Sequence, residues 1–217
     1  MKRTKRILLS LMTIALVCVL IGAGIFAYFS DTETVPATFT TGTLNLKVGA
    51  NDPCTETIGI GGLKPGDTSN AGTWLTRNDG SISGNLTVAI GAITNNENTL
   101  TEPEAAASDL GEPGELGANL KVAFWMDVDK SGGWNSGDYY LKSDGTKVAW
   151  VSGSTLPTAA YDTVDSYASK TWTDCQNVAA STDLGNFRVE YDLPSGTGNT
   201  VQSDSCSFTI TFTLNQA

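Results

Sequence analysis

The sequence predicts an all-β protein, in which a single jelly-roll or β-sandwich domain follows an N-terminal signal peptide helix. Two observations carry this prediction. Short runs of β-branched and aromatic residues alternate with Gly, Asn, Asp and Pro along most of the chain. Near the C-terminus, Phe208, Ile210, Phe212 and Leu214 alternate with threonines. This alternation is typical of a strand with one buried face and one solvated face.

The N-terminus has the composition of an export signal. A basic start precedes an apolar run over residues 7–27, and polar residues follow it. The basic residues are Lys2, Arg3, Lys5 and Arg6. These features, with a small residue at the boundary, are the parts of a secretory signal peptide. Residues 1–27 are therefore predicted to be a signal peptide.

We expect a signal peptidase to cut between Ala27 and Tyr28. The chain would then meet the membrane only before cleavage, and the mature protein would be secreted to the extracellular matrix or the cell surface. The alternative is a retained anchor, because the apolar run is also long enough to cross a bilayer as a helix.

The charge balance argues against nucleic acid as a partner. The chain has 13 Lys and Arg residues and 23 Asp and Glu residues, and the predicted cleavage would remove only basic ones. Proteins that bind nucleic acid present clustered positive charge instead. The length suits one domain with a sizeable core.

Histidine is absent from the chain. Zinc proteases of the His-Glu-x-x-His type and Ser-His-Asp hydrolases each need an imidazole as ligand or base. The sequence therefore predicts that the protein is not an enzyme, and it offers no catalytic or cofactor-binding residues apart from the metal ligands below.

The strands are predicted from β-rich runs bounded by turn residues, and they belong to a domain spanning residues 49–217 with a lead segment at 28–48. The expected strands are 38–48, 56–60, 71–77, 84–91, 119–126, 139–142, 147–151, 187–193 and 206–214. Residues 95–117 differ, because six acidic residues, Pro103 and Pro113 surround a short alanine run. We expect an acidic surface loop there, with one helical turn at most.

Three cysteines remain after the predicted cleavage: Cys54, Cys175 and Cys206. In an oxidising compartment, the simplest expectation is one disulfide and one free thiol, with any of the three pairings open. The alternative is that all three are small buried apolar residues.

Residues 127–138 have the spacing of a calcium-binding loop. Oxygen-bearing side chains fall at positions one, three, five, nine and twelve, with Gly132 at the sharp turn and a backbone carbonyl expected at position seven. The predicted Ca²⁺ ligands are Asp127, Asp129, Ser131, Gly133, Asn135 and Asp138. Only three are carboxylates, so we expect an affinity of roughly 10⁻⁴ to 10⁻³ M. The alternative is an acidic hairpin turn that holds no ion.

Three sequence patterns occur in order along the chain. Residues 27–34 are Ala-Tyr-Phe-Ser-Asp-Thr-Glu-Thr, and residues 37–46 are Ala-Thr-Phe-Thr-Thr-Gly-Thr-Leu-Asn-Leu. Leu-Lys-Pro-Gly-Asp at 63–67 is followed by Asn-Asp-Gly-Ser-Ile at 78–82. Together they resemble the TasA/camelysin family, whose members carry signal peptides of the SipW-dependent type and include archaeal bundling-pilus subunits.

The resemblance implies a jelly-roll subunit that self-associates into biofilm-matrix fibres or bundling pili. In such assemblies, the freed N-terminal segment of one subunit completes the sheet of the next. In an extended segment, every second side chain points to the same face. The apolar residues Phe29, Val35, Ala37 and Phe39 are all odd-numbered, so they could enter a neighbour's groove together. Asp31 and Glu33 share that parity as well and would need solvent or a partner.

Other functions remain open at this point. The camelysin name attaches a cell-surface metalloendopeptidase label to part of the family, and a monomeric calcium-binding adhesin is a third possibility. The lead segment could also be an intramolecular edge strand or a disordered tail.

Overall fold

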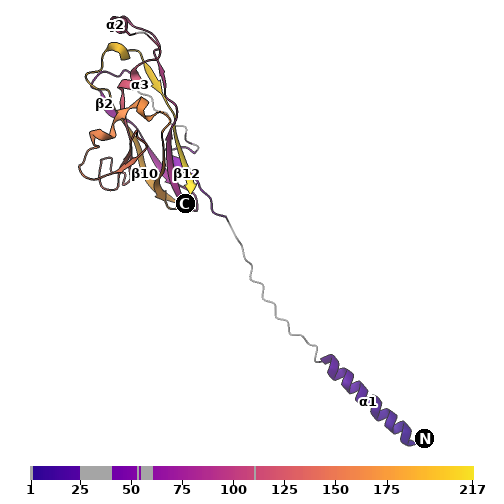
Figure 1. Cartoon of the computed structure of the whole chain (residues 1–217). Helices are drawn as coiled ribbons and strands as arrows, with labels where there is room; N and C mark the ends of the chain where they lie inside the picture. The colour runs from indigo at the N-terminus through magenta and orange to yellow at the C-terminus, as the bar shows by residue number, and fades with distance from the viewer. Residues whose placement is uncertain (1, 25–40, 53, 55–60, 110) are drawn as a thin grey trace. The chain divides into compact units, whose positions relative to one another are not determined.

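The computed structural model describes residues 2–24, 41–52, 54, 61–109 and 111–217 (Figure 1). The chain divides into two compact units, Met1–Thr40 and Thr41–Ala217. In the first unit, α1 spans Lys2–Gly24, within the predicted signal peptide. The apolar side chains described in this helix, at residues 7–16, are exposed and include Leu8 and Leu11. Among the described residues, no helix has both the length and the hydropathy that crossing a bilayer requires.

The second unit consists mainly of antiparallel sheets, which confirms the predicted all-β sandwich. The larger sheet has the strand order β1-β2-β10-β5-β6-β7, with β8 paired to β5. Its strands are β1 (Leu46–Val48), β2 (Thr68–Asn78), β10 (Thr182–Asp192), β5 (Lys121–Asp127), β6 (Tyr139–Leu141), β7 (Lys147–Ala149) and β8 (Asp162–Thr163).

The smaller sheet has the order β12-β3-β9, and β4 pairs separately with β11. These strands are β12 (Ile210–Gln216), β3 (Gly84–Ile90), β9 (Thr171–Val178), β4 (Thr94–Asn96) and β11 (Ser205–Ser207). The short helices are α2 (Glu102–Ala106), α3 (Leu116–Asn119) and the 3₁₀ turns η1 (Thr158–Ala160), η2 (Val164–Tyr167) and η3 (Asn199–Val201). Both α2 and α3 lie toward the end of the domain away from the C-terminus (Figure 1).

The core lies between the two sheets. Phe124 of β5 and Phe187 of β10 stack with ring centroids 6.3 Å apart in the larger sheet. Phe187 meets Phe212 of β12 edge to face at 4.9 Å, so the aromatic contacts cross from one sheet to the other. Leu86 and Val88 of β3, in the smaller sheet, belong to the same buried cluster. Apolar burial of this kind is the main favourable contribution to folding.

A second apolar cluster covers the outer face of the larger sheet. Trp134 packs edge to face on Trp125 of β5, with ring centroids 5.9 Å apart, and it also contacts Tyr140. Trp125, Trp134 and Trp172 are all buried. These three tryptophans therefore belong to the packing of the domain and not to its exposed surface.

The predicted strand 206–214 is wrong as a single element. It divides into β11, which pairs with β4, and β12, which pairs with β3. The strands that pair with these two segments are separated in the same way, because β3 ends at Ile90 and β4 starts only at Thr94. A hydrogen bond from Gly91 N to Thr209 O, at 2.9 Å, continues the pairing across the bend. The side-chain alternation from Phe208 to Leu214 is nevertheless as predicted.

Strand β9 was not predicted, and a bulge explains why. Its buried residues, Trp172, Cys175 and Val178, do not alternate with period two. The register shifts between Leu86 and Val88 of β3, and Asp174 has a positive φ of 51°. Between these two pairs β9 advances four residues, from Trp172 to Gln176, while β3 advances two, and the extra residues of β9 break the alternation by which a strand is recognised.

Several other predicted strands change length, and one cannot be compared. Only residues 46–48 of the predicted strand 38–48 form a strand among the described residues, and residues 56–60 lie outside them. In contrast, β10 begins five residues before the predicted 187–193, through a bulge at Gly185, which has a φ of 141°. Asp and Gly are depleted in strands, so residues 182–186 carry little strand signal.

Each of the two main sheets has two edge strands among the described residues, which are β1 and β7 in the larger sheet and β12 and β9 in the smaller sheet. β12 pairs with β3 on one side only. β1 covers β2 only at residues 76–78, which leaves residues 68–75 of β2 paired with β10 on one side, apart from a hydrogen bond from Gly49 N to Leu75 O. Open edges of this kind can accept a further strand.

Candidate functional site

The loop over residues 127–138 connects β5 to β6, and the strand register brings its two ends together. Met126 and Tyr139 are the last paired residues of this hairpin. Asp127 and Asp138 occupy the next position on each strand, so they face each other where the hairpin opens. Both side chains are fully buried. The predicted first and last ligands are therefore adjacent because of the pairing, not because of the loop alone.

Backbone N–H groups hold the two buried carboxylates in place. Asp127 accepts hydrogen bonds from Ser131 N at 3.0 Å and from Gly132 N at 2.9 Å. Asp138 accepts from Val128 N at 2.9 Å and from Asn135 N at 2.8 Å. With Asp129, these carboxylates offer one oxygen each within a span of 4.8 Å. The loop therefore presents three carboxylates to a common centre.

The remaining predicted ligands surround the same centre. Asn135 Nδ2 donates to Asp129 Oδ2 at 3.0 Å and to Ser131 Oγ at 2.7 Å. Ser131 Oγ in turn donates to the Gly133 carbonyl at 3.2 Å. A half-turn of the Asn135 amide would exchange its NH₂ for its oxygen. The structure thus brings together all six residues that the spacing singled out.

The carboxyl groups of this loop differ in the direction of their pKa shifts. Burial raises the pKa of Asp138, whereas hydrogen bonds from Ser131 lower the pKa of Asp129. Arg188 Nη1 lies 3.7 Å from Asp127 Oδ2, and its guanidinium covers the Trp125 ring at 5.0 Å from the centroid. This positive charge opposes a bound cation, which is consistent with a weak site rather than a tight one. Arg188 was not singled out from the sequence, because it lies on β10.

The three cysteines that the structure describes outside the signal segment are unpaired. Cys54 is exposed, Cys175 is buried and Cys206 is half-buried, and all three are free thiols. The expected disulfide is therefore not formed here. Burial raises the pKa of Cys206 to about 11, so this thiol is weakly nucleophilic at neutral pH.

The predicted cleavage and strand-donation residues cannot be compared with the structure. Ala27, Tyr28, Phe29, Val35, Ala37 and Phe39 lie outside the described residues.

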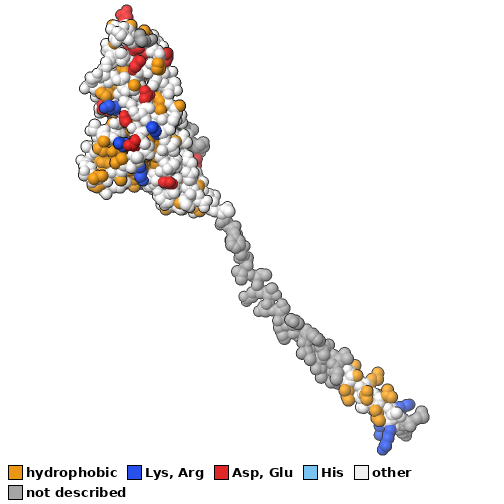
Figure 2. Space-filling view, in the orientation of Figure 1, with side chains coloured by type: hydrophobic (Ala, Val, Ile, Leu, Met, Phe, Trp, Pro, Cys, Tyr) orange, Lys and Arg blue, Asp and Glu red, His pale blue; other side chains and the backbone are white. Residues whose placement is uncertain are grey.

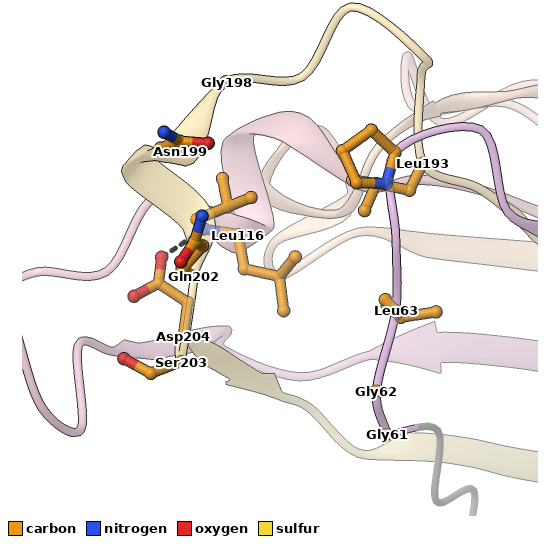
Figure 3. A pocket seen from close by; sticks show the side chains of 12 residues that line it. Gly61, Gly62, Leu63, Leu116, Leu193, Gly198, Asn199, Gln202, Ser203 and Asp204 are labelled. Carbon is orange, nitrogen blue, oxygen red and sulfur yellow. Dashed lines mark hydrogen bonds between the residues drawn. The ribbon is translucent and has the colours of Figure 1, made fainter. Parts of the chain in front are cut away.

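The structure also shows two features that the sequence did not indicate. One is a cavity of about 390 Å³ whose lining includes Leu63, Leu116, Leu193 and Asp204 (Figure 3). The other is a group of carboxylates, in which Glu97, Glu104 and Asp204 offer one oxygen each within a span of 4.8 Å. Glu97 and Glu104 belong to the acidic segment 95–117, but both are buried, so this segment is only partly the surface loop that we predicted.

A comparison with protein families gives a match over nearly the whole chain. The family model described as Camelysin metallo-endopeptidase matches residues 2–217, which covers both structural units. A search of curated proteins finds no match to the chain.

Proposed function

Because the chain belongs to the TasA/camelysin family, whose members are cell-surface or secreted proteins, we propose that it is a secreted structural subunit of extracellular fibres or bundling pili. In this proposal, the segment at residues 28–48 of one subunit is donated to the sandwich of the next. Signal peptidase cleavage between Ala27 and Tyr28 would free that segment.

The observation that carries the proposal is the incomplete burial of β12. Ile210, Phe212 and Leu214 of β12 lie directly opposite Ile90, Val88 and Leu86 of β3. Directly opposed residues of an antiparallel pair point to the same face. The β3 residues are at most 2% exposed, whereas those of β12 are only half-buried. The apolar face therefore extends to an edge to which no described strand other than β3 is hydrogen-bonded, although β1 lies close to part of it.

A donated strand would satisfy that edge in two ways. Its backbone would pair with the open side of β12 or of residues 68–75 in β2, as in other cases of strand addition. Its apolar side chains would extend the core, each large one contributing roughly 1.5 to 3 kcal/mol before ordering costs. Phe29, Val35, Ala37 and Phe39 have the required parity, while Asp31 and Glu33 would have to reach solvent or a positive partner.

Electron microscopy of the secreted protein, combined with N-terminal sequencing, tests this proposal. We expect filaments built from chains that begin at Tyr28. A secreted protein that stays monomeric at every concentration, as judged by light scattering, would favour the adhesin instead.

We further propose that the chain is not a protease, although the family description names a metallo-endopeptidase. It has no histidine to bind zinc or act as a base. The secreted preparation is therefore expected to leave casein intact, with or without a chelator. Casein cleavage that a chelator abolishes would contradict this.

We also propose that the 127–138 loop binds Ca²⁺ as a stiffening ion. At ten to one hundred times a Kd of roughly 10⁻⁴ to 10⁻³ M, bound Ca²⁺ should stabilise the fold by about 1 to 3 kcal/mol. We expect a rise of a few degrees in Tm, and a change in tryptophan fluorescence because Trp134 lies in the loop.

The loop proposal has a matched control. Asp129→Asn removes one carboxylate of the loop and should reduce the Ca²⁺ effect. Asp144→Asn makes the same charge change at an exposed residue of the β6–β7 turn, and it should retain the effect. Unchanged Tm and fluorescence of the unmodified chain at about 100 mM Ca²⁺, one hundred times the weak end of the expected Kd range, would show that the loop holds no ion.

A further inference from the structure

A second set of carboxylates meets at the α2 end of the domain, and strand register again explains the meeting. The β4–β11 ladder ends with Asn96 opposite Ser205. Glu97 and Asp204 occupy the next position on each strand, so they face each other although they are far apart in the sequence. Acidic side chains are visible on the surface at this end of the domain (Figure 2).

Three more carboxylates join this pair. We call the set the acidic cluster, and its members are Glu97, Glu104, Asp109, Glu115 and Asp204. Glu97, Glu104 and Asp204 offer one oxygen each within a span of 4.8 Å, and so do Glu97, Asp109 and Glu115. Glu97 belongs to both groups. The acidic cluster is therefore one continuous arrangement centred on Glu97.

Backbone N–H groups orient these side chains and leave other oxygens free. Glu104 Oε2 accepts from Thr101 N, Asp109 Oδ1 accepts from Gly111 N at 2.9 Å, and Asp204 Oδ2 accepts from Leu116 N at 3.0 Å. The buried oxygens without a hydrogen-bond partner are Glu97 Oε1 and Oε2, Glu104 Oε1, Asp109 Oδ2, Glu115 Oε2 and Asp204 Oδ1. Each member thus contributes at least one unsatisfied oxygen.

As ionised carboxylates, these buried oxygens lack the positive partner that buried charges normally have. Glu104 is fully buried and Glu97 is 5% exposed. Among the described residues, no Lys or Arg forms an ion pair with any member. Buried carboxylates are normally paired or bound to a metal, because removing an unpaired charge from water is costly.

The raised pKa values of three of these carboxyl groups also reflect the lack of a nearby positive charge. Burial, together with the neighbouring Asp204, Glu104 and Asp109 carboxylates, raises the pKa of Glu97 to about 7. Burial and acidic neighbours also raise the pKa values of Glu115 and Asp204. The chain passes close to these groups, since a Cβ at Gly114 would lie 2.8 Å from Asp204 Oδ1.

We propose that the acidic cluster is a binding site for a hard divalent cation, Ca²⁺, distinct from the 127–138 loop. All the free donors are carboxylate oxygens, which suit Ca²⁺ rather than the softer transition metals. Ca²⁺ accepts six to eight oxygens in flexible geometry, whereas Mg²⁺ demands a near-ideal octahedron. The bound ion would join the ends of β4 and β11 to α2 and to the start of α3. The site does not depend on the proposed assembly.

Calcium titration of the purified full-length chain, after removal of metal with a chelator, tests the proposal. Calorimetry should show weaker Ca²⁺ binding at one site in Glu104→Gln than in the unmodified chain. Changes to the outer partners of metal ligands already weaken binding by about 10- to 100-fold, so losing a ligand carboxylate should cost at least about tenfold in affinity. Asp109→Asn, at a half-buried member, should act in the same direction if Glu104→Gln does not fold.

In thermal melts, Glu104→Gln should change Tm in opposite directions in chelator and in Ca²⁺, which a purely structural role of Glu104 would not produce. In chelator, Glu104→Gln should raise Tm, because it removes one charge from a set of repelling carboxylates. In Ca²⁺ it should lower Tm relative to the unmodified chain.

The matched control is Glu102→Gln, which changes the same charge on the same helix at an exposed residue outside the acidic cluster. It should leave both the stoichiometry and the Tm shift unchanged. Asp129→Asn should weaken only the 127–138 loop site. The proposal is overturned if Glu104→Gln and Asp109→Asn bind Ca²⁺ with unaltered stoichiometry and affinity, and an equal effect of Mg²⁺ would contradict the choice of Ca²⁺.

Discussion

Deleting residues 28–35 from the mature chain is expected to abolish fibres while leaving folded monomers. The deletion removes Phe29 and Val35, two of the apolar residues proposed to enter the neighbouring subunit. It leaves Thr41–Ala217 intact, which is a compact unit with its own core. Losing two large buried side chains would cost about 3 to 6 kcal/mol, or roughly 10²- to 10⁴-fold in affinity between subunits. Electron microscopy and circular dichroism of the secreted protein measure the two outcomes.

Substitutions on the two opposite faces of the extended segment provide the control for this deletion. Val35→Asp and Phe39→Asp place charges on the face that should be buried, so they should prevent assembly. Thr34→Asp and Thr38→Asp introduce the same charges on the opposite face and should permit it. Fibres that persist in the deletion, or equal effects of the two pairs, would rule out donation by this segment.

Phe124→Ala should have the largest effect on stability. Phe124 is fully buried and contacts Tyr167 edge to face at 4.9 Å, Phe187 at 6.3 Å and Phe208 at 5.9 Å. Truncating a buried Phe costs about 3 to 5 kcal/mol, because transfer free energy is lost and a cavity is left behind. Typical domains have only about 5 to 15 kcal/mol of stability, so the variant would be close to unfolding. Urea denaturation measures the change.

The control for this variant is Val151→Ala, at a residue that is 82% exposed. Its free energy of unfolding should change by no more than about 0.5 kcal/mol. A Phe124→Ala cost below about 1 kcal/mol would contradict the placement of this ring between the sheets.

The sequence predicted those features of the fold and of the candidate site that depend on local residue patterns. Alternating residues such as Phe212 and Leu214 identified the sandwich, because strand side chains have period two. Oxygen-bearing residues spaced along 127–138 identified a loop whose members do meet in the structure. In each case the contacts join residues that are close in sequence or that share one strand.

Features that depend on pairing between distant strands could not be predicted. The division of 206–214 follows from the separate partners β3 and β4, and the irregular burial of β9 follows from the bulge near Asp174. The acidic cluster depends on the register that sets Asp204 opposite Glu97. Neither residue carries a motif that points to the other, so the acidic segment 95–117 indicated only solvent exposure.

Hydrogen–deuterium exchange on the deleted chain tests strand donation most directly. A synthetic peptide of residues 28–40 is added to the monomers that lack residues 28–35, and a peptide of scrambled sequence serves as the control. If donation occurs, the native peptide slows exchange in β12 (Ile210–Gln216) or in residues 68–75 of β2, where the described chain leaves open edges. If the peptide does not bind, or binds while exchange in both edges stays unchanged, strand donation into this sandwich is contradicted.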